Sequence, residues 1–307
     1  MSYTYEIQTK ARGLLESKQV DCVIGYEIGP RGRTRPAFIY QPEEVERLVW
    51  NQACTHNLTI YLKKQLDPQQ PGRLKTKEQT PRHAAVVIKA CDSRAVNVLL
   101  AENHFGREQL HVIGVVCDGI QEGAGEVGNQ RSVRQFPAVD PPQFQVRCQR
   151  CIERVPVVFD TLIGERPSNQ KSGMHENVLD DLDCLQAMTP TERTDFWLSQ
   201  FDRCIRCYAC RQACPMCSCP TCLYERDDSL WVGMGIGLNE KRTFHLGRAF
   251  HLAGRCIGCD ECERVCPMDI PISLLNRRLI QEVETVFGYR AGMAQVPPPF
   301  VTVLSDR

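Results

Sequence analysis

Two runs of four cysteines with the same spacing restrict the fold of this chain more than any other feature. Each run reads C-x2-C-x2-C-x3-C-P, a spacing typical of ligands to cubane iron–sulfur clusters. Three thiolates at this spacing can reach three corners of one cube, and the proline that follows has a fixed φ and turns the chain away. The sequence therefore predicts a domain with two [4Fe–4S] clusters. The runs contain Cys204, Cys207, Cys210 and Cys214, and then Cys256, Cys259, Cys262 and Cys266.

The fourth cysteine of each run is expected to bind the cluster of the other run, because its longer spacing directs it away from its own three. Zinc is the alternative, since C-x2-C pairs also bind zinc. Zinc sites, however, take four ligands from two separated pairs and not from a run of four that occurs twice. The expected ligand sets are Cys204, Cys207, Cys210 and Cys266 for one cluster, and Cys256, Cys259, Cys262 and Cys214 for the other.

The N-terminal half has the pattern of an α/β domain with parallel strands. Residues 85–88 (AVVI) and 112–116 (VIGVV) are short apolar runs typical of strands buried on both faces, and a helical pattern lies between them. Strand, helix and strand in this order predict a βαβ unit, whose two strands are parallel. Cys91 and Cys117 then follow the carboxyl ends of these strands, the edge at which open α/β sheets bind ligands.

A third [4Fe–4S] cluster is our hypothesis for this edge. Cys148 and Cys151 add a C-x2-C pair to Cys91 and Cys117, which completes a set of four ligands. The alternative is that all four are ordinary thiols, since free cysteine is often buried. Residues 123–128 match G-x-G-x-x-G, but they do not lie directly between a strand and a helix. We therefore expect a loop there and not a dinucleotide site.

The remaining cysteines have less distinctive spacing. Cys217, Cys219 and Cys222 follow the first run as C-x-C-x2-C. They are either extra ligands or thiols packed near the first cluster, and their spacing does not decide between these alternatives. Three others are isolated, which predicts a structural role: Cys22, Cys54 and Cys184.

A cationic helix is expected from residue 239 to residue 253, leading into the second run. It carries His245, Arg248 and His251, and Arg255 follows it directly. These side chains form either a solvated or packed helical face, or a group of cations that stabilises the reduced cluster. The second interpretation rests on the effect of nearby charge on cluster potentials.

Composition limits the partners and the compartment. The 307 residues include 37 Lys and Arg and 37 Asp and Glu, and this balance argues against nucleic-acid binding and a polybasic membrane patch. No apolar run has membrane-spanning length, and the N-terminus lacks the apolar core of a signal peptide. We expect a cytoplasmic protein of anaerobic metabolism, in a reducing setting where thiolates bind metals. The expected domains are an α/β domain at 1–161, a linker at 162–188, a mainly α-helical ferredoxin-type domain at 189–290 and an extended tail at 291–307.

Several segments resemble a known group of redox proteins. The beta subunits of deazaflavin-reducing hydrogenases and formate dehydrogenases have cluster-binding segments similar to VIKACDSRAVNVLL, GVVCDGI and RCQRCIERVPVVFD. The dicluster subunits of heterodisulfide-reductase-type complexes have segments similar to CIRCYACRQACPMCSC and GRAFHLAGRCIGCDECERVCPMDIP. The resemblance implies an electron-relay subunit that works with other redox subunits in a cytoplasmic oxidoreductase. The hydrogenase beta subunits also carry a flavin, so the resemblance raises FAD as a further cofactor.

The predicted chemistry is one-electron transfer, because the sequence has no nucleophile with a base, no phosphate-binding loop and no open-site metal triad. No substrate site of the chain's own is evident. Two other functions stay open. One is a flavin-containing catalytic subunit that reduces a small acceptor, and the other is a redox-sensing or structural cluster protein, since cluster assembly can drive folding.

Overall fold

The fold is known from a computed structural model that describes residues 2–66, 83–121, 144–166, 181–226, 228 and 232–299. The chain divides into two compact units. Unit 1 comprises Met1–Val127, Pro141–Glu176 and Gly292–Pro297, and unit 2 comprises Gly128–Asp140, Asn177–Ala291 and Pro298–Arg307. The glycine-rich residues 123–128 lie outside the described residues.

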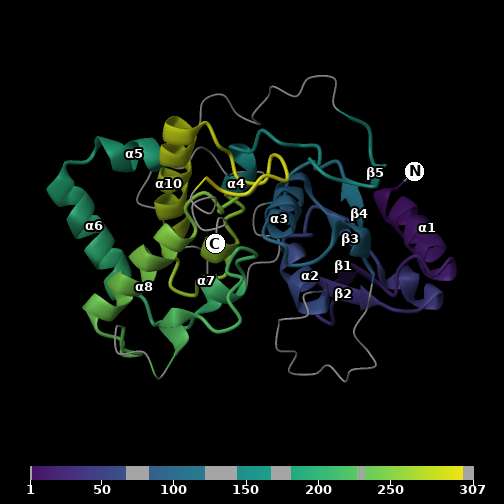
Figure 1. The fold of residues 1–307 in the computed structure, drawn as a ribbon, viewed down its shortest axis with the longest axis horizontal. Coiled ribbons are helices and arrows are strands. Elements are labelled where there is room, and N and C mark those ends of the chain that lie inside the picture. Colours follow the sequence, from purple (N-terminus) through teal and green to yellow (C-terminus); the bar gives the residue numbers. More distant parts are fainter. Residues whose placement is uncertain are drawn as a thin grey trace, which may run out of the picture. The chain divides into compact units, whose positions relative to one another are not determined.

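Unit 1 is built on a five-stranded sheet with the order β2-β1-β3-β4-β5 (Figure 1). The strands β1, β3, β4 and β5 are parallel, and β2 pairs with β1 in the antiparallel direction. The predicted α/β domain with parallel strands is therefore confirmed, with one antiparallel strand at its edge. The strands are β1 (Cys22–Ile28), β2 (Thr34–Ile39), β3 (Ala84–Ile88), β4 (Leu110–Val115) and β5 (Thr161–Ile163).

The parallel sheet is apolar because helices cover both of its faces. All five residues of β3 are buried, and alternate side chains point to opposite faces. Ile7 and Leu14 of α1 (Tyr3–Glu16) share a core cluster with Val23, Val87 and Val115. Figure 1 shows α1 on one side of the sheet and α2 (Thr59–Leu66) and α3 (Ala90–Ala101) on the other. The remaining helical segments of this unit are η1 (Pro42–Arg47), η2 (Arg107–Gln109) and α4 (Val146–Gln149).

Unit 2 consists of helices and connecting loops in its described residues, with no strand among them. The long helices are α6 (Pro190–Asp202), α8 (Leu238–His251) and α10 (Ile272–Phe287), and α8 packs against the other two. The shorter segments are α5 (Asp181–Ala187), α7 (Ala209–Gln212), η3 (Leu223–Glu225) and α9 (Glu261–Arg264). Helix α5 lies in the stretch for which a linker is predicted, and it packs on α10 through Leu182, Leu185 and Leu274. The described part of the predicted tail, up to residue 299, contains neither helix nor strand.

Helix α6 brings the chain to the first cysteine run, and its start is fixed locally. The Thr189 hydroxyl accepts a hydrogen bond from the backbone N–H of Glu192 at 3.3 Å, and the Glu192 carboxylate accepts one from the backbone N–H of Thr189 at 2.7 Å. Pro190 occupies the first helical position. This reciprocal capping box holds the first turn.

The two cysteine runs have the same backbone course. Residues Arg206 and Gly258 are at equivalent positions, and both have positive φ, 50° and 69°. Two residues later, Tyr208 and Asp260 also have left-handed values, 59° and 53°. A single helical turn follows in each case, α7 in the first run and α9 in the second. The runs are therefore a structural repeat as well as a sequence repeat.

Among the described residues, no helix combines the length and the apolar character needed to cross a membrane.

Candidate metal centres

The loop of the first run is held by Arg206, which is buried although it lies next to the exposed Cys207. Its guanidinium donates hydrogen bonds to the carbonyl oxygens of Gly233 and Gly235, both at 2.6 Å. The Tyr208 hydroxyl accepts a third, at 2.8 Å. These bonds tie the segment before α8 to the cysteine loop, so that the thiols of the loop are fixed in place.

A small, largely apolar cavity lies inside this loop. It is lined by aromatic and aliphatic side chains, including Phe244 and Ile270, and by sulfur. Burial raises the pKa of the Cys210 thiol to about 11, and the nearby thiols of the set add to this rise. The four cysteines that line the cavity are Cys204, Cys207, Cys210 and Cys266. The structure thus brings Cys266 of the second run to the first three cysteines of the first run.

The second set of thiols has the reciprocal arrangement. Burial raises the pKa of Cys256 to about 12, and the neighbouring Cys214 contributes to this rise. Burial also raises the pKa of Cys259 and that of Cys262, again with a contribution from Cys214. Cys214 therefore lies with the second run and not with its own. Asn276 of α10 donates a hydrogen bond to Cys262 Sγ at 3.7 Å, a contact that nothing in the sequence indicates.

Arg248 lies between the two sets. Its side chain is in the interior, with 4% of its surface exposed, and its guanidinium donates a hydrogen bond to the carbonyl oxygen of Cys210 at 3.1 Å. Although burial lowers the pKa of Arg248, surrounding thiols outweigh this effect and hold the pKa well above its ordinary value. These thiols include members of both runs, Cys210 and Cys214 of the first and Cys262 of the second, together with Cys217.

His245 lies one turn before Arg248 on the same helix and lines the cavity of the first set. Burial, together with the charges of Arg248 and Arg206, lowers its pKa to about 4, so the imidazole is neutral. Its ring stacks on Phe201 with a centroid distance of 5.0 Å, and neither ring nitrogen has a hydrogen-bond partner. Of the four cationic positions predicted on this helix, His251 is exposed and Arg255 donates to the Ser218 hydroxyl at 2.8 Å. Arg248 is thus the buried cation of the group.

The three cysteines after the first run separate in the structure. The Cys217 thiol donates a hydrogen bond to Cys214, which lowers the pKa of Cys214 to about 5. Cys222 packs at the edge of the core cluster around Phe244, and Cys219 is exposed. Of these three, Cys217 is hydrogen-bonded to a thiol of the candidate sets, and Cys222 packs against the core cluster that includes Cys204, Cys210 and Cys262.

The third set lies at the carboxyl edge of the sheet in unit 1. Cys91 is in the first turn of α3, which follows β3, and Cys117 comes two residues after β4. Shortly after Cys117, Gln121 pairs with Phe144 in an isolated antiparallel β-bridge. Next to this bridge, the backbone N–H of Gln145 donates to the carbonyl oxygen of Ile120 at 2.8 Å. This pairing places Cys148 and Cys151, the C-x2-C pair, beside the sheet edge.

The thiols of this third set are close enough to influence one another. Burial raises the pKa of Cys117 to about 12, and Cys148 and Cys151 add to the rise. Burial likewise raises the pKa of Cys91, with further contributions from Cys117 and Cys151. The backbone N–H of Ile120 donates to Cys148 Sγ at 3.3 Å. All four cysteines predicted for this site are therefore together.

A buried ion pair supports the same edge. Lys89 and Asp92 flank Cys91, and Lys89 Nζ lies 2.8 Å from Asp92 Oδ2. The ammonium group also donates to the Tyr26 hydroxyl at 2.5 Å and to the carbonyl oxygen of His56 at 2.7 Å. The pair fixes the start of α3, and the sequence did not indicate it.

The donor sets suit a group with several metal corners. Each set offers four cysteine sulfurs, and backbone N–H groups donate to some of them, as at the sulfur atoms of Cys204 and Cys148. Within the described part of the chain, no three His, Cys, Asp or Glu side chains converge closely enough to hold a single metal ion. Cysteine thiolates are the ligands of iron–sulfur clusters, so the chemistry of these donor sets fits such clusters.

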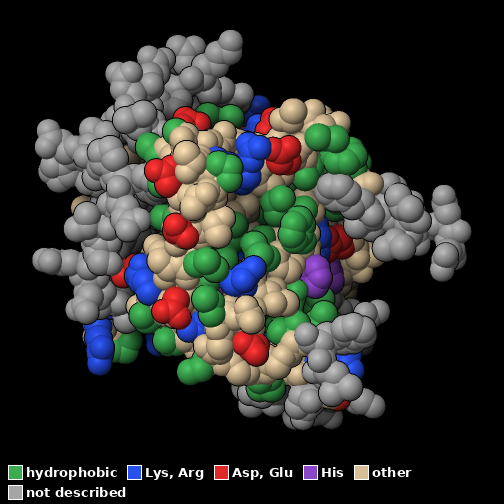
Figure 2. All heavy atoms as spheres, turned by 90° about the vertical axis from the view of Figure 1, so that its left-hand side faces the viewer, with side chains coloured by type: hydrophobic (Ala, Val, Ile, Leu, Met, Phe, Trp, Pro, Cys, Tyr) green, Lys and Arg blue, Asp and Glu red, His purple; other side chains and the backbone are tan. Residues whose placement is uncertain are grey.

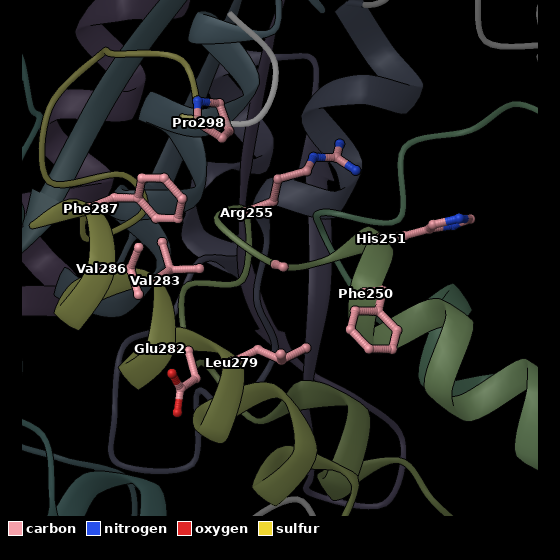
Figure 3. Close-up of a pocket in the computed structure, with 10 residues that line it drawn as sticks. Phe250, His251, Arg255, Leu279, Glu282, Val283, Val286, Phe287 and Pro298 are labelled. Carbon is pink, nitrogen blue, oxygen red and sulfur yellow. The ribbon is translucent and has the colours of Figure 1, made fainter. Parts of the chain in front are cut away.

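An apolar groove lies beside the second run, between α8 and α10 (Figure 3). Phe250 of α8 faces Leu279, Val283 and Phe287 of α10 across it, and Phe250 is 67% exposed. In Figure 2, hydrophobic side chains gather on the visible face between scattered charged ones. The groove follows the helix that enters the second run, and it belongs to unit 2 alone.

Comparisons with known proteins agree with this chemistry. A family model described as a 4Fe-4S dicluster domain matches residues 203–271. The F420-dependent formate dehydrogenase subunit beta of Methanocaldococcus jannaschii is 23% identical, over 94% of this chain and 92% of that protein. The F420-dependent formate dehydrogenase 1 subunit beta of Methanococcus maripaludis is 35% identical, over 70% of this chain and 74% of that protein.

Proposed function

The chain belongs to the family of F420-dependent formate dehydrogenase beta subunits, and we propose that it passes electrons between partner subunits through three [4Fe–4S] clusters. It is an iron–sulfur electron-relay subunit of an oxidoreductase complex. The observation that carries the proposal is the exchange of Cys214 and Cys266 between the two runs, which is the arrangement expected of a ferredoxin-type dicluster domain.

The protein's own residues hold, shield and tune these centres. When bound, a [4Fe–4S] cluster accepts and returns one electron at a time. The twelve cysteines of the three sets would be the ligands, with the crossed assignment in unit 2. Buried apolar side chains such as Phe244 and Ile270 exclude water, and backbone N–H groups at the ligand sulfurs stabilise negative charge. Of the twelve, Cys207 is the one that is exposed, so electrons would enter or leave unit 2 most directly at the first set.

The third cluster rests on the set in unit 1. Cys91, Cys117, Cys148 and Cys151 come from three separate segments, and Cys148 and Cys151 both lie near enough to Cys117 to raise its pKa. The carboxyl edge of the sheet is also the place where open α/β folds bind their ligands. This convergence supports a cluster there in preference to isolated thiols.

A second candidate activity concerns the acceptor. Both relatives are named as subunits of F420-dependent formate dehydrogenases, and oxidation of formate releases an electron pair. We infer that the complex of this chain exchanges electrons with F420, with FAD in unit 1 as the converter from one-electron to two-electron steps. A cytoplasmic location is part of the same proposal. Flavin released on denaturing the anaerobically purified complex tests the FAD, and its absence would contradict it.

The ligand assignment is tested by metal content in single variants of the whole protein. The wild-type chain, purified without air, is expected to contain about twelve irons and as much acid-labile sulfide, at four irons per cubane. Cys266→Ala should lose the electron paramagnetic resonance signal of the first cluster, and Cys214→Ala that of the second. Cys184→Ala, at an isolated cysteine, is the control and should retain all iron.

Two outcomes would contradict the proposal. One is zinc in place of iron and sulfide in the wild-type protein. The other is the loss of the second cluster's signal in Cys266→Ala with the first cluster retained, because that result would reverse the assignment. Retention of about twelve irons in Cys91→Ala would remove the third cluster alone.

A further inference from the structure

Arg248 has a position that the relay function does not by itself require. It is a buried cation on α8, and its guanidinium donates to the carbonyl oxygen of Cys210 in the first set. The same guanidinium acts on Cys214 and Cys262 of the second set. One positive charge therefore serves both candidate cluster sites, in an interior from which water is excluded.

The guanidinium also has one hydrogen-bond donor that no acceptor in the described part of the structure satisfies. Its Nε–H is buried and has no hydrogen-bond partner in the structure. Buried donors are nearly always satisfied, so an orphan donor among thiols indicates a ligand or an added acceptor at that place. The sulfur atoms of a bound cluster are acceptors of this kind.

The charges that face Arg248 come from several elements. Thiols approach it from the two cysteine runs, and Asp260 lies near the second set and adds negative charge there. His245, one turn earlier on α8, is neutral, so it does not supply a second cation on the inner face of this helix. An arginine stays protonated throughout the physiological range, and its charge is constant during electron transfer.

We propose that Arg248 allows both clusters of unit 2 to be reduced at the same time, so that this unit stores an electron pair. The inference rests on the proposed function. With clusters bound by these cysteines, the two electrons would come from the redox centre of one partner subunit, one to each cluster, and would leave to that of another. Arg248 neither gains nor loses a proton.

The physical reason is the repulsion between the two added electrons. A first electron in one cluster makes the second electron harder to add to its neighbour, and the effect is strong in a medium of low dielectric constant. A fixed positive charge between them raises the reduction potential of both clusters, so the second electron is added at a less negative potential despite the repulsion. Formate gives up two electrons when it is oxidised to carbon dioxide. A relay that holds one electron in each of two clusters can therefore accept both electrons of such a donor in a single encounter.

The test compares variants of the whole protein, purified without air. Arg248→Met removes the charge with little change in side-chain length, and Arg248→Lys retains it. Arg242→Met, at an exposed arginine on the same helix, is the matched control. Each variant is titrated with a low-potential chemical reductant, and electron paramagnetic resonance records the singly reduced state and the spin-coupled, doubly reduced state.

The expected result is a selective loss of the doubly reduced state. At the potential where the wild-type protein is half doubly reduced, the ratio of doubly to singly reduced protein should be at least tenfold lower in Arg248→Met, which corresponds to about 59 mV for a one-electron step. Arg248→Lys should stay within threefold of the wild type, and Arg242→Met should match it. Iron and sulfide content, measured first, must equal those of the wild type.

The proposal is overturned if fully loaded Arg248→Met reaches the doubly reduced state as easily as Arg242→Met does. If Arg248→Met loses iron, Arg248→Gln, which keeps hydrogen-bond donors without charge, takes its place under the same criterion. Loss of iron in both would assign Arg248 to folding and also overturn the proposal. Failure of the proposed function is distinct from these outcomes, because it would appear as missing iron and sulfide in the wild-type protein.

Discussion

Replacing Asp92 by Asn removes one member of an ion pair from the interior of unit 1. The side chains of Lys89 and Asp92 are only 2% and 1% exposed, and their charged atoms lie 2.8 Å apart. In the variant, Lys89 would keep its bonds to the Tyr26 hydroxyl and the His56 carbonyl oxygen but would lose its counter-charge. Breaking a buried pair on one side costs about 3–5 kcal/mol. We expect the local free energy of opening of β3 and α3 to fall by this amount.

The pH dependence of the variant follows from the same contacts. Without Asp92, burial favours the neutral amine, so the pKa of Lys89 in the folded state falls below that in the unfolded chain. The unfolded chain then binds more protons between these two values, and stability rises with pH across that window. The cost of Asp92→Asn should therefore shrink as the pH approaches the ordinary pKa of lysine, about 10.4.

Amide hydrogen exchange of the intact protein, followed by mass spectrometry, measures the effect locally. Peptides across β3 and α3 should lose about two to four powers of ten in protection, at 1.4 kcal/mol for each tenfold change. Glu46→Gln is the control, because the Arg12–Glu46 pair has a similar distance, 2.7 Å, but its side chains are 37% and 70% exposed. It should cost about 1 kcal/mol or less. Equal protection in Asp92→Asn and the wild type would refute the reasoning.

Two further predictions concern packing and thiol chemistry. A Cβ added at Gly247 would overlap the Tyr224 hydroxyl, so Gly247→Ala should destabilise unit 2 by about 1–3 kcal/mol. Gly13 on α1 has open space around it, so Gly13→Ala should instead stabilise the protein by about 0.8–1 kcal/mol. Thermal unfolding without air compares the two, and equal shifts would contradict the assignment of space around these glycines. Burial raises the pKa of Cys22 to about 12, so this thiol should resist alkylation at pH 8 while the exposed Cys219 reacts; labelling of Cys22 in the native protein would show that it is not buried.

The repeated cysteine motif and the apolar strand pattern were the features from which the dicluster domain and the parallel sheet could be predicted. The cysteine spacing reports ligand geometry directly, because the distance between corners of a cluster limits the number of residues between thiols. Strands β3 and β4 were predictable because short, fully apolar runs of four or five residues are typical of strands buried on both faces. The parallel sheet and the 4Fe-4S dicluster domain are both confirmed.

Contacts between distant residues could not be predicted in the same way. Asn276 reaches Cys262 from a helix that begins after the second run, and Lys89 meets Tyr26 across 63 residues of sequence. Such pairs depend on how elements pack, and no local pattern reports them. The cationic helix shows the same limit, because the sequence put His245 and Arg248 on one helix but could not tell a buried, neutral imidazole from a charged one.

The equal backbone course of the two cysteine runs requires a left-handed residue at the same point of each. The second copy of the motif has Gly258 there, at no conformational cost. The first copy places Arg206 there, which costs on the order of 1–2 kcal/mol of backbone energy. In return, this side chain anchors the segment around Gly233 and Gly235, which has no counterpart in the second half. Replacing the first run by the second would therefore preserve the ligand loop but remove the side chain that holds the segment around Gly233 and Gly235.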